Sequence, residues 1–266
     1  MLRYGSVSQS AGLKKWIASA AVADYGDSVA LWKPPSTPFA RGIAVGSVSL
    51  HNRSGGTVKA GLGARFPVSL WVAGQVTSAG AFTDDTTDAQ DAGTADFSMH
   101  DRSNSGSGFL VGCEVPFNIV GIVQSAAGDQ TTPVLVLEYW NGSAWTDIVG
   151  SVFIGDTLIG GGTGEKILCF PLPSDWAVGG SGTDVSATKY NLRVRHTTAG
   201  AGTADPVASQ LFVGFAKMLL EGLGDNSIAS LIREHELCFP PQCDALFPIF
   251  STADRQNAVE VDVRAY

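Results

Sequence analysis

Hydrophobic and polar residues alternate with a two-residue period along several short stretches of the chain. In 258–264 three valines fall on one face and charged residues on the other, and 190–195 shows a similar alternation. Such alternation is typical of β-strands with one buried face. Clusters of Gly, Ser, Thr and Asp separate the stretches and predict turns. The pattern predicts strands at 43–50, 56–62, 66–73, 109–115, 117–124, 133–140, 144–154, 166–171, 190–197, 211–220, 246–251 and 258–264.

One hairpin is predicted within this series. Asn141-Gly142 lies between two stretches that are rich in aromatic and aliphatic residues, Leu137 to Trp140 and Trp145 to Val149. Asn-Gly favours a type I′ turn, because both central residues of that turn need a positive φ. We therefore expect a β-hairpin with an aromatic-rich end.

Helical spacing is found at only two places. Residues 1–41 have the character of an extended arm, because Pro34-Pro35 and Pro38 exclude regular structure near its end. Earlier in the arm an apolar stripe predicts one short helix through Leu13, Trp16, Ile17 and Ala20. A second helix is expected over 227–237, capped by Asp225 or Ser227, with a stripe formed by Ile228, Leu231, Ile232 and His235.

These elements predict an all-β fold, a β-sandwich of jelly-roll or immunoglobulin-like type. The expected organisation is an N-terminal arm at 1–41, a sandwich body at 42–220 and a C-terminal extension at 221–266 with one helix and closing strands. The 32 glycines and the low charged fraction of 16% fit many short strands joined by turns. The polar stretch 74–108 is expected to be a long connection.

Charge is distributed unevenly along the chain. Residues 1–41 carry five basic and two acidic side chains, a net of +3, so the remaining residues carry −11 of the total of −8. An acidic body argues against nucleic acid as the main partner. The basic arm is either a solvated tail or a segment that docks on an acidic neighbour. No apolar run approaches the length of about 20 residues that spans a membrane, and we expect no signal peptide.

The middle of the chain resembles a β-sandwich module of tailed-bacteriophage and phage-like virion structural proteins. Five pieces carry the resemblance, in order over about residues 86–200: Asp88–Phe97, Gly108–Gly112 with Pro116-Phe117, Glu138–Trp145, Phe170–Trp176 and Tyr190–Thr198. The chain departs from the pattern at Asn191, where an aromatic or apolar residue is expected, and at Cys113. The module carries no catalytic group, so the resemblance implies a structural role on the capsid or the tail of a virion.

Three groups of residues suggest binding chemistry: three tryptophans, a set of aspartates, and a histidine with nearby cysteines. Trp140, Trp145 and Trp176 could stack on sugar rings or could pack the sandwich. Carboxylates between residues 84 and 101 could bind Ca²⁺, although their spacing matches no EF-hand and ordinary turns share this composition; they are Asp84, Asp85, Asp88, Asp91, Asp96 and Asp101.

The cysteines allow three states. His235, Cys238 and Cys243 could bind zinc with a fourth ligand such as Asp244 or His196. Cys238 and Cys243 could instead form a disulfide across a two-proline loop, and buried free thiols are the third state. Cys113 and Cys169 lie in apolar strands and are expected to be buried thiols.

No catalytic motif is found in the sequence. We therefore predict a non-enzymatic virion structural protein without cofactor or metal, most simply a capsid-surface decoration, cement or spike-base protein. Its partners would be other virion proteins and further copies of itself, with neither nucleic acid nor membrane. The alternatives are a tail, baseplate or fibre component, or a carbohydrate-binding module that recognises a host glycan. Expected partner contacts are Lys14, Lys15, Trp16, Ile17, Arg41, Trp140 and Trp145.

Overall fold

The computed structural model describes residues 43–51, 56–93, 96–101, 103–128, 135–149, 152–154, 163–183, 185–198, 204–225, 227–240, 242–250 and 258–265. The predicted arm lies outside this part of the chain, together with Lys14, Lys15, Trp16, Ile17 and Arg41. The regular structure of the described residues is mostly β-strand, with only one short α-helix and one 3-10 turn, which is consistent with the predicted all-β sandwich. They fall into two compact units, one of residues 66–214 and one of residues 43–65 with 215–265. The first unit lies within the segment expected to form the sandwich body.

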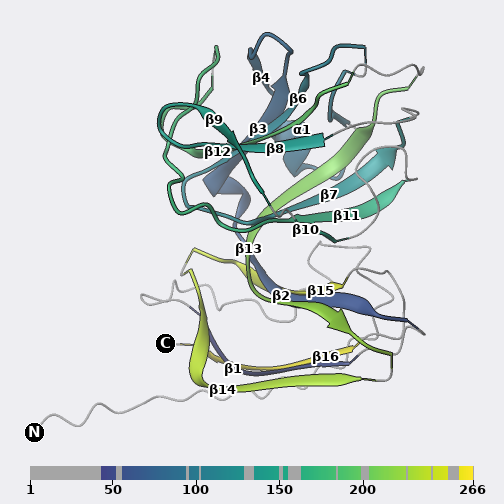
Figure 1. The fold of residues 1–266 in the computed structure, drawn as a ribbon, viewed down its shortest axis with the longest axis vertical. Helices are drawn as coiled ribbons and strands as arrows, with labels where there is room; N and C mark the ends of the chain where they lie inside the picture. Colours follow the sequence, from purple (N-terminus) through teal and green to yellow (C-terminus); the bar gives the residue numbers. More distant parts are fainter. Residues whose placement is uncertain are drawn as a thin grey trace, which may run out of the picture. The chain divides into compact units, whose positions relative to one another are not determined.

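The unit of residues 66–214 contains two antiparallel sheets (Figure 1). The six-stranded sheet has the order β4-β3-β6-β12-β8-β9, and the opposing sheet contains β10-β11-β7-β13, with β5 beside β13. The strands of the six-stranded sheet are β3 (Trp71–Val76), β4 (Phe82–Asp84), β6 (Gly108–Cys113), β8 (Leu135–Trp140), β9 (Trp145–Asp147) and β12 (Tyr190–His196). The opposing strands are β5 (Phe97–Ser98), β7 (Ile119–Ala126), β10 (Val152–Ile154), β11 (Gly164–Cys169) and the start of β13 (Val207–Leu223).

Aromatic side chains fill the core of this unit. The Trp176 ring lies 5.0 Å from Phe117 and 6.0 Å from Tyr190, measured between ring centroids. Such edge-to-face and tilted contacts add to the burial of large apolar area. The core also contains Phe97 and Phe109, whose rings meet edge to face at 5.9 Å. The alternating pattern of the strands therefore places one face of each sheet in a shared aromatic core.

The other unit contains a three-stranded antiparallel sheet with β1 in the centre, ordered β14-β1-β16. Its second group of strands has β2 between β15 and the end of β13. Arg65 and Asp244 join β2 to the start of β15 through a pair of hydrogen bonds, at 2.9 and 3.0 Å. The strands are β1 (Ile43–His51), β2 (Val58–Arg65), β14 (Ile228–Phe239), β15 (Ala245–Phe250) and β16 (Ala258–Ala265).

The helix predicted over 227–237 is wrong, because this stretch forms strand β14. Its apolar residues recur at helical spacing, but backbone pairing with β1 from Ile228 to Phe239 overrides the local pattern. The four residues 233–236 lie opposite Gly46 alone, between Ile232 and Leu237, which explains why the strand does not alternate cleanly.

The polar stretch 74–108 is also more regular than predicted. It contains the end of β3, then β4, β5 and the five-residue helix α1 (Thr86–Gln90). Thr86 donates its hydroxyl to the Ala73 carbonyl and accepts from the Ala73 amide, which ties the start of α1 to β3. The segment before β3 holds a short 3-10 turn, η1 (Val68–Leu70), rather than the start of a strand. No helix in the described part of the chain is long and apolar enough to cross a membrane.

Candidate functional site

The predicted aromatic hairpin is present as β8 and β9. Trp140 and Trp145 lie directly opposite each other in the ladder, and their rings meet edge to face at 5.7 Å. Both indoles are half-buried. The hairpin thus brings together two of the residues that were expected to make contacts.

The turn differs in detail from the predicted one. The Asn141 amide donates to the Ala144 carbonyl at 3.1 Å, so the two residues inside the loop are Gly142 and Ser143. Gly142 has a φ of 94°, which glycine adopts without strain. Asn141 closes the loop with its side chain, whose Oδ1 accepts from the Ser143 and Ala144 amides at 2.9 and 2.8 Å. Asn141 is therefore a capping residue of the turn rather than one of its two central residues.

A charged cluster lies beside the tryptophans on the same face of the sheet. Glu138 is opposite Arg193 in the ladder, and both Arg193 and Arg195 contact its carboxylate. Arg195 makes a two-pronged contact, with Nε 2.7 Å from Oε2 and Nη2 2.9 Å from Oε1. The Arg193 guanidinium also lies over the Trp145 ring, 4.5 Å from its centroid. We call Glu138, Arg193, Arg195 and Trp145 the Glu138 cluster.

The electrostatics of this cluster favour the charged state of Glu138. The carboxylate is only 4% exposed, and burial raises the pKa of Glu138. Hydrogen bonds from Arg195 and the charge of Arg193 outweigh that effect, so the net pKa lies below its usual range. The buried charge is therefore satisfied, as a stable sheet face requires.

The connection before β12 is tied to this face at several points. The Trp145 Nε1 donates to the Ser181 carbonyl at 3.0 Å, and the Ala177 amide donates to the Trp140 carbonyl at 2.9 Å. A Cβ on Gly180 would lie 3.1 Å from the Trp145 ring, so the chain passes close to the indole. We call residues 177–189 the covering loop. It leaves the tryptophan pair partly enclosed rather than presented as an open platform.

Asn191 fixes the covering loop to the sheet. It is fully buried, and its Nδ2 donates to the Gly179 and Ser186 carbonyls, both at 2.8 Å. Its Oδ1 has no hydrogen-bond partner among the described residues. It lies close to Gly112, where a Cβ would come within 2.4 Å of that oxygen. Asn191 thus has a defined structural role in holding the covering loop.

Trp176 does not belong to this surface. It is 8% exposed and packs in the aromatic core, and its Nε1 lies 3.3 Å from the Asn191 carbonyl. Nearby, the Tyr139 hydroxyl donates to the Asp175 carboxylate at 2.8 Å, which raises the pKa of Tyr139. Any stacking surface would therefore consist of Trp140 and Trp145 without Trp176.

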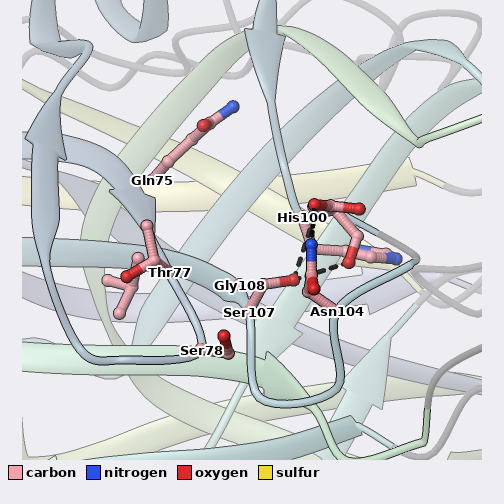
Figure 2. A pocket seen from close by; sticks show the side chains of 9 residues that line it. Gln75, Thr77, Ser78, His100, Asn104, Ser107 and Gly108 are labelled. Carbon is pink, nitrogen blue, oxygen red and sulfur yellow. Dashed lines mark hydrogen bonds between the residues drawn. The ribbon is translucent and has the colours of Figure 1, made fainter.

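A small polar pocket opens where β3 ends and β6 begins (Figure 2). Its volume is about 150 Å³. Asp101 accepts hydrogen bonds from the Asn104 side chain and the Ser103 amide, and these lower the pKa of its carboxyl. The lining residues are Gln75, Val76, Thr77, Ser78, His100, Asp101, Asn104, Ser107 and Gly108.

Ser107 and His196 form the closest arrangement to a catalytic pair in the described chain. The Ser107 Oγ lies 2.9 Å from the His196 Nε2, and both residues are buried. However, the Ser107 hydroxyl donates to the Asp101 carbonyl at 2.7 Å. The His196 Nδ1 faces the Thr198 carbonyl at 3.0 Å, where a catalytic triad would have a carboxylate. These contacts tie the 101–107 turn to the end of β12 and favour a structural role for the pair.

The other predicted sites have simpler outcomes. Cys113 and Cys169 are buried free thiols, as predicted. Cys243 is buried, whereas the side chains of His235 and Cys238 lie outside the described part, so the proposed zinc site and disulfide stay predictions. Within the described residues no three His, Cys, Asp or Glu side chains gather to hold a metal ion. The aspartates of the predicted calcium loop are spread over β4, α1 and the segments around β5.

Sequence reasoning missed the Glu138 cluster, Asn191 and the Ser107–His196 contact. The signal for the cluster was present, because alternation along 190–195 places Arg193 and Arg195 on one face. Glu138 is the single charged residue in the otherwise apolar and aromatic stretch 135–140. What a single sequence lacks is the pairing of β8 with β12, which brings the three charges together. No family model matches this chain, and no curated protein matches it significantly.

Proposed function

We propose that this protein is a non-enzymatic structural protein of a tailed-bacteriophage virion, which acts through subunit contacts as a capsid-surface decoration, cement or spike-base protein. The supporting observation is where the five pieces of the resemblance lie. All of them fall within the compact unit of residues 66–214, and they contribute β5, β6, β12 and the β8–β9 hairpin. The resemblance therefore covers one compact sandwich rather than scattered segments.

The roles of the polar side chains support a structural function. Glu138 is neutralised by two arginines, Asn191 ties down the covering loop, and Ser107 donates to a backbone carbonyl. Catalysis needs a nucleophile or base that is free to react with a substrate. Hydrogen bonds and ion pairs within the chain already engage the Glu138 carboxylate, the Asn191 Nδ2 and the Ser107 hydroxyl.

The test is to determine whether the chain is part of purified virus particles and in how many copies. We expect quantitative mass spectrometry to find it at a copy number that is a multiple of the capsid symmetry. A second expectation concerns the arm: a chain that lacks residues 1–41 should fold but fail to incorporate. Absence of the protein from particles would contradict the proposal, and normal incorporation of the shortened chain would contradict the role of the arm.

A place on the tail, baseplate or fibre is the alternative within the same class. Antibody labelling of intact particles separates the two, because label on capsid faces supports decoration and label at the tail supports the alternative. The copy number distinguishes them as well, since tails follow threefold or sixfold symmetry rather than that of the capsid.

Carbohydrate binding is the candidate from another class, and one observation favours it. Trp140 and Trp145 keep half-exposed indoles on one sheet face, and aromatic faces bind sugar rings. A glycan array with the native chain and the variants W140A and W145A tests this. Signal that both variants lose would support host-glycan recognition, and a silent array with the native chain would contradict it.

A further inference from the structure

The strands at the edges of the sheets differ in length. In the unit of residues 66–214 the edge strands β4, β9 and β10 have three residues each. The edge strand β15 has six residues, and in the three-stranded sheet the edge strands β14 and β16 have twelve and eight. A long edge strand presents many backbone groups to a further strand, whereas a short one presents few. Within the described chain, the three-stranded sheet therefore offers the long edges.

The two long edges are not equivalent. In β14, residues 233–236 lie opposite Gly46 alone, and these four residues are Arg, Glu, His and Glu. A bulge that carries charges obstructs the addition of another strand. β16 pairs with β1 over its whole length. The ladder has one register shift, and the extra residue there is Gly46 of β1, so β16 itself has no bulge. β16 is consequently the long edge with continuous strand geometry.

We infer that β16 pairs antiparallel with β16 of a second copy of this chain, so that two three-stranded sheets join into one of six strands across a twofold axis. An antiparallel contact of a strand with itself is closed and isologous, which limits the assembly to two copies at this edge. The occupant is a second copy because the charges of β16 complement one another when the strand is reversed.

The charge pattern selects the register. Centring the pair on Val263 places Asp262 opposite Arg264 of the second copy, twice by symmetry. Opposite charges across a strand pair are stabilising, and like charges are destabilising. Centring on Asp262 would pair Glu260 with Arg264 but would also place the two Asp262 carboxylates against each other, and centring on Arg264 would place the two Arg264 guanidinium groups against each other. Centring on Val261 would place Glu260 against Asp262. A slip by one residue would place valines against charged residues.

The β16 pairing would be one of the subunit contacts of the proposed virion protein. Only the biological use of the pairing rests on the proposed function. Self-association of the purified full-length chain is measured without reference to a virion. A chain that stays monomeric would overturn the β16 pairing and leave the proposed function to the particle analysis. A chain that forms this dimer but is absent from virus particles would support the β16 pairing and contradict the proposed function.

The experiment is sedimentation velocity over a range of concentrations with three charge variants. The native chain should dimerise. R264D should weaken dimerisation at least about tenfold, because it places a second carboxylate opposite Asp262 in both contacts. The charge swap D262R/R264D should restore most of the affinity. The matched control R233E, on the other edge, should dimerise like the native chain.

Three outcomes would overturn the pairing: a monomeric native chain, unchanged dimerisation of R264D, or an equal loss in R233E. Far-ultraviolet circular dichroism establishes whether each variant keeps its strands. Hydrogen exchange gives a readout on the native chain alone, which holds even if a variant fails to fold. Amides of 261–265, the described residues that pair in this register, should be better protected at dimer-forming concentration than at high dilution, and equal protection in both would also overturn the pairing.

Discussion

Glu138 and Arg193 lie directly opposite each other on β8 and β12, and the Arg193 Nη2 is 2.7 Å from the Glu138 Oε2. Arg195 contacts the same carboxylate, so one buried negative charge faces two guanidinium groups. Removing one member of a buried ionic group leaves the others uncompensated, which costs more than the group contributes when it is intact. The stability of the hairpin face therefore depends on Glu138.

We expect E138Q to lower the free energy of unfolding by about 2 kcal/mol, because glutamine keeps the shape but loses the charge that both arginines contact. Urea denaturation monitored by tryptophan fluorescence measures the change. The matched control is D147N, which removes an exposed carboxylate directly opposite Glu138 in the β8–β9 ladder. It should change stability by less than about 0.5 kcal/mol. Equal losses in both variants would contradict the special role of Glu138.

The contribution of Glu138 should depend on pH in a defined direction. Its folded-state pKa lies below the usual value, so its stabilising effect is complete above the unfolded pKa of about 4.3. The effect is lost as pH falls through the lower folded value, because the folded and unfolded states then bind the same proton. The difference in unfolding free energy between native chain and E138Q should be constant near neutral pH and shrink in acid. A difference that grows in acid would have the wrong sign.

Asn191 should be the residue that holds the covering loop. We expect N191A to lower the free energy of unfolding by about 3 kcal/mol, since it leaves the buried Gly179 carbonyl and the part-buried Ser186 carbonyl without their donor. Hydrogen exchange should show faster exchange in the covering loop, and T188A, an exposed change in that loop, serves as the control. Unchanged exchange in N191A would show that other contacts hold the loop.

Burial should make two thiols slow to react. It raises the pKa of Cys113 to about 11 and that of Cys169 to about 12. The thiolate is the nucleophile, and it is scarce near neutral pH under these conditions. Iodoacetamide should therefore label both residues far more slowly in the folded chain than in urea, as peptide mass spectrometry measures. Equal rates in the two states would contradict their burial.

The alternating strands could be predicted from sequence because their pattern and their tertiary environment agree. β12 and β16 fall almost where alternation predicts them, at 190–196 and 258–265. In β14 the two disagree: Ile228, Leu231 and Ile232 recur at helical spacing, but β1 supplies a backbone partner. A single sequence contains no information on that partner, so the local pattern predicted a helix.

The candidate site was predictable to a smaller extent, for a related reason. Trp140 and Trp145 were identified because a turn signal lies between them, and the contact is local in sequence. Glu138 and Arg193 are 55 residues apart, and Asn191 acts on a loop whose path depends on packing. Non-local contacts of this kind require the strand order, which periodicity does not determine.

The turn of the aromatic hairpin offers a test of how Asn141 acts. Its Oδ1 accepts hydrogen bonds from the Ser143 amide and hydroxyl and from the Ala144 amide. N141A removes that acceptor and should lower the free energy of unfolding by about 1 kcal/mol, whereas N141D keeps the acceptor and should stay within about 0.5 kcal/mol of the native chain. Thermal and urea denaturation measure both.

If Asn141 instead contributed only through its tolerance of a positive φ, as in the predicted type I′ turn, the acceptor would be irrelevant. N141G would then match the native chain, because glycine adopts that conformation freely. The side-chain mechanism predicts that N141G is as destabilised as N141A, so the order of the three variants decides between the two mechanisms.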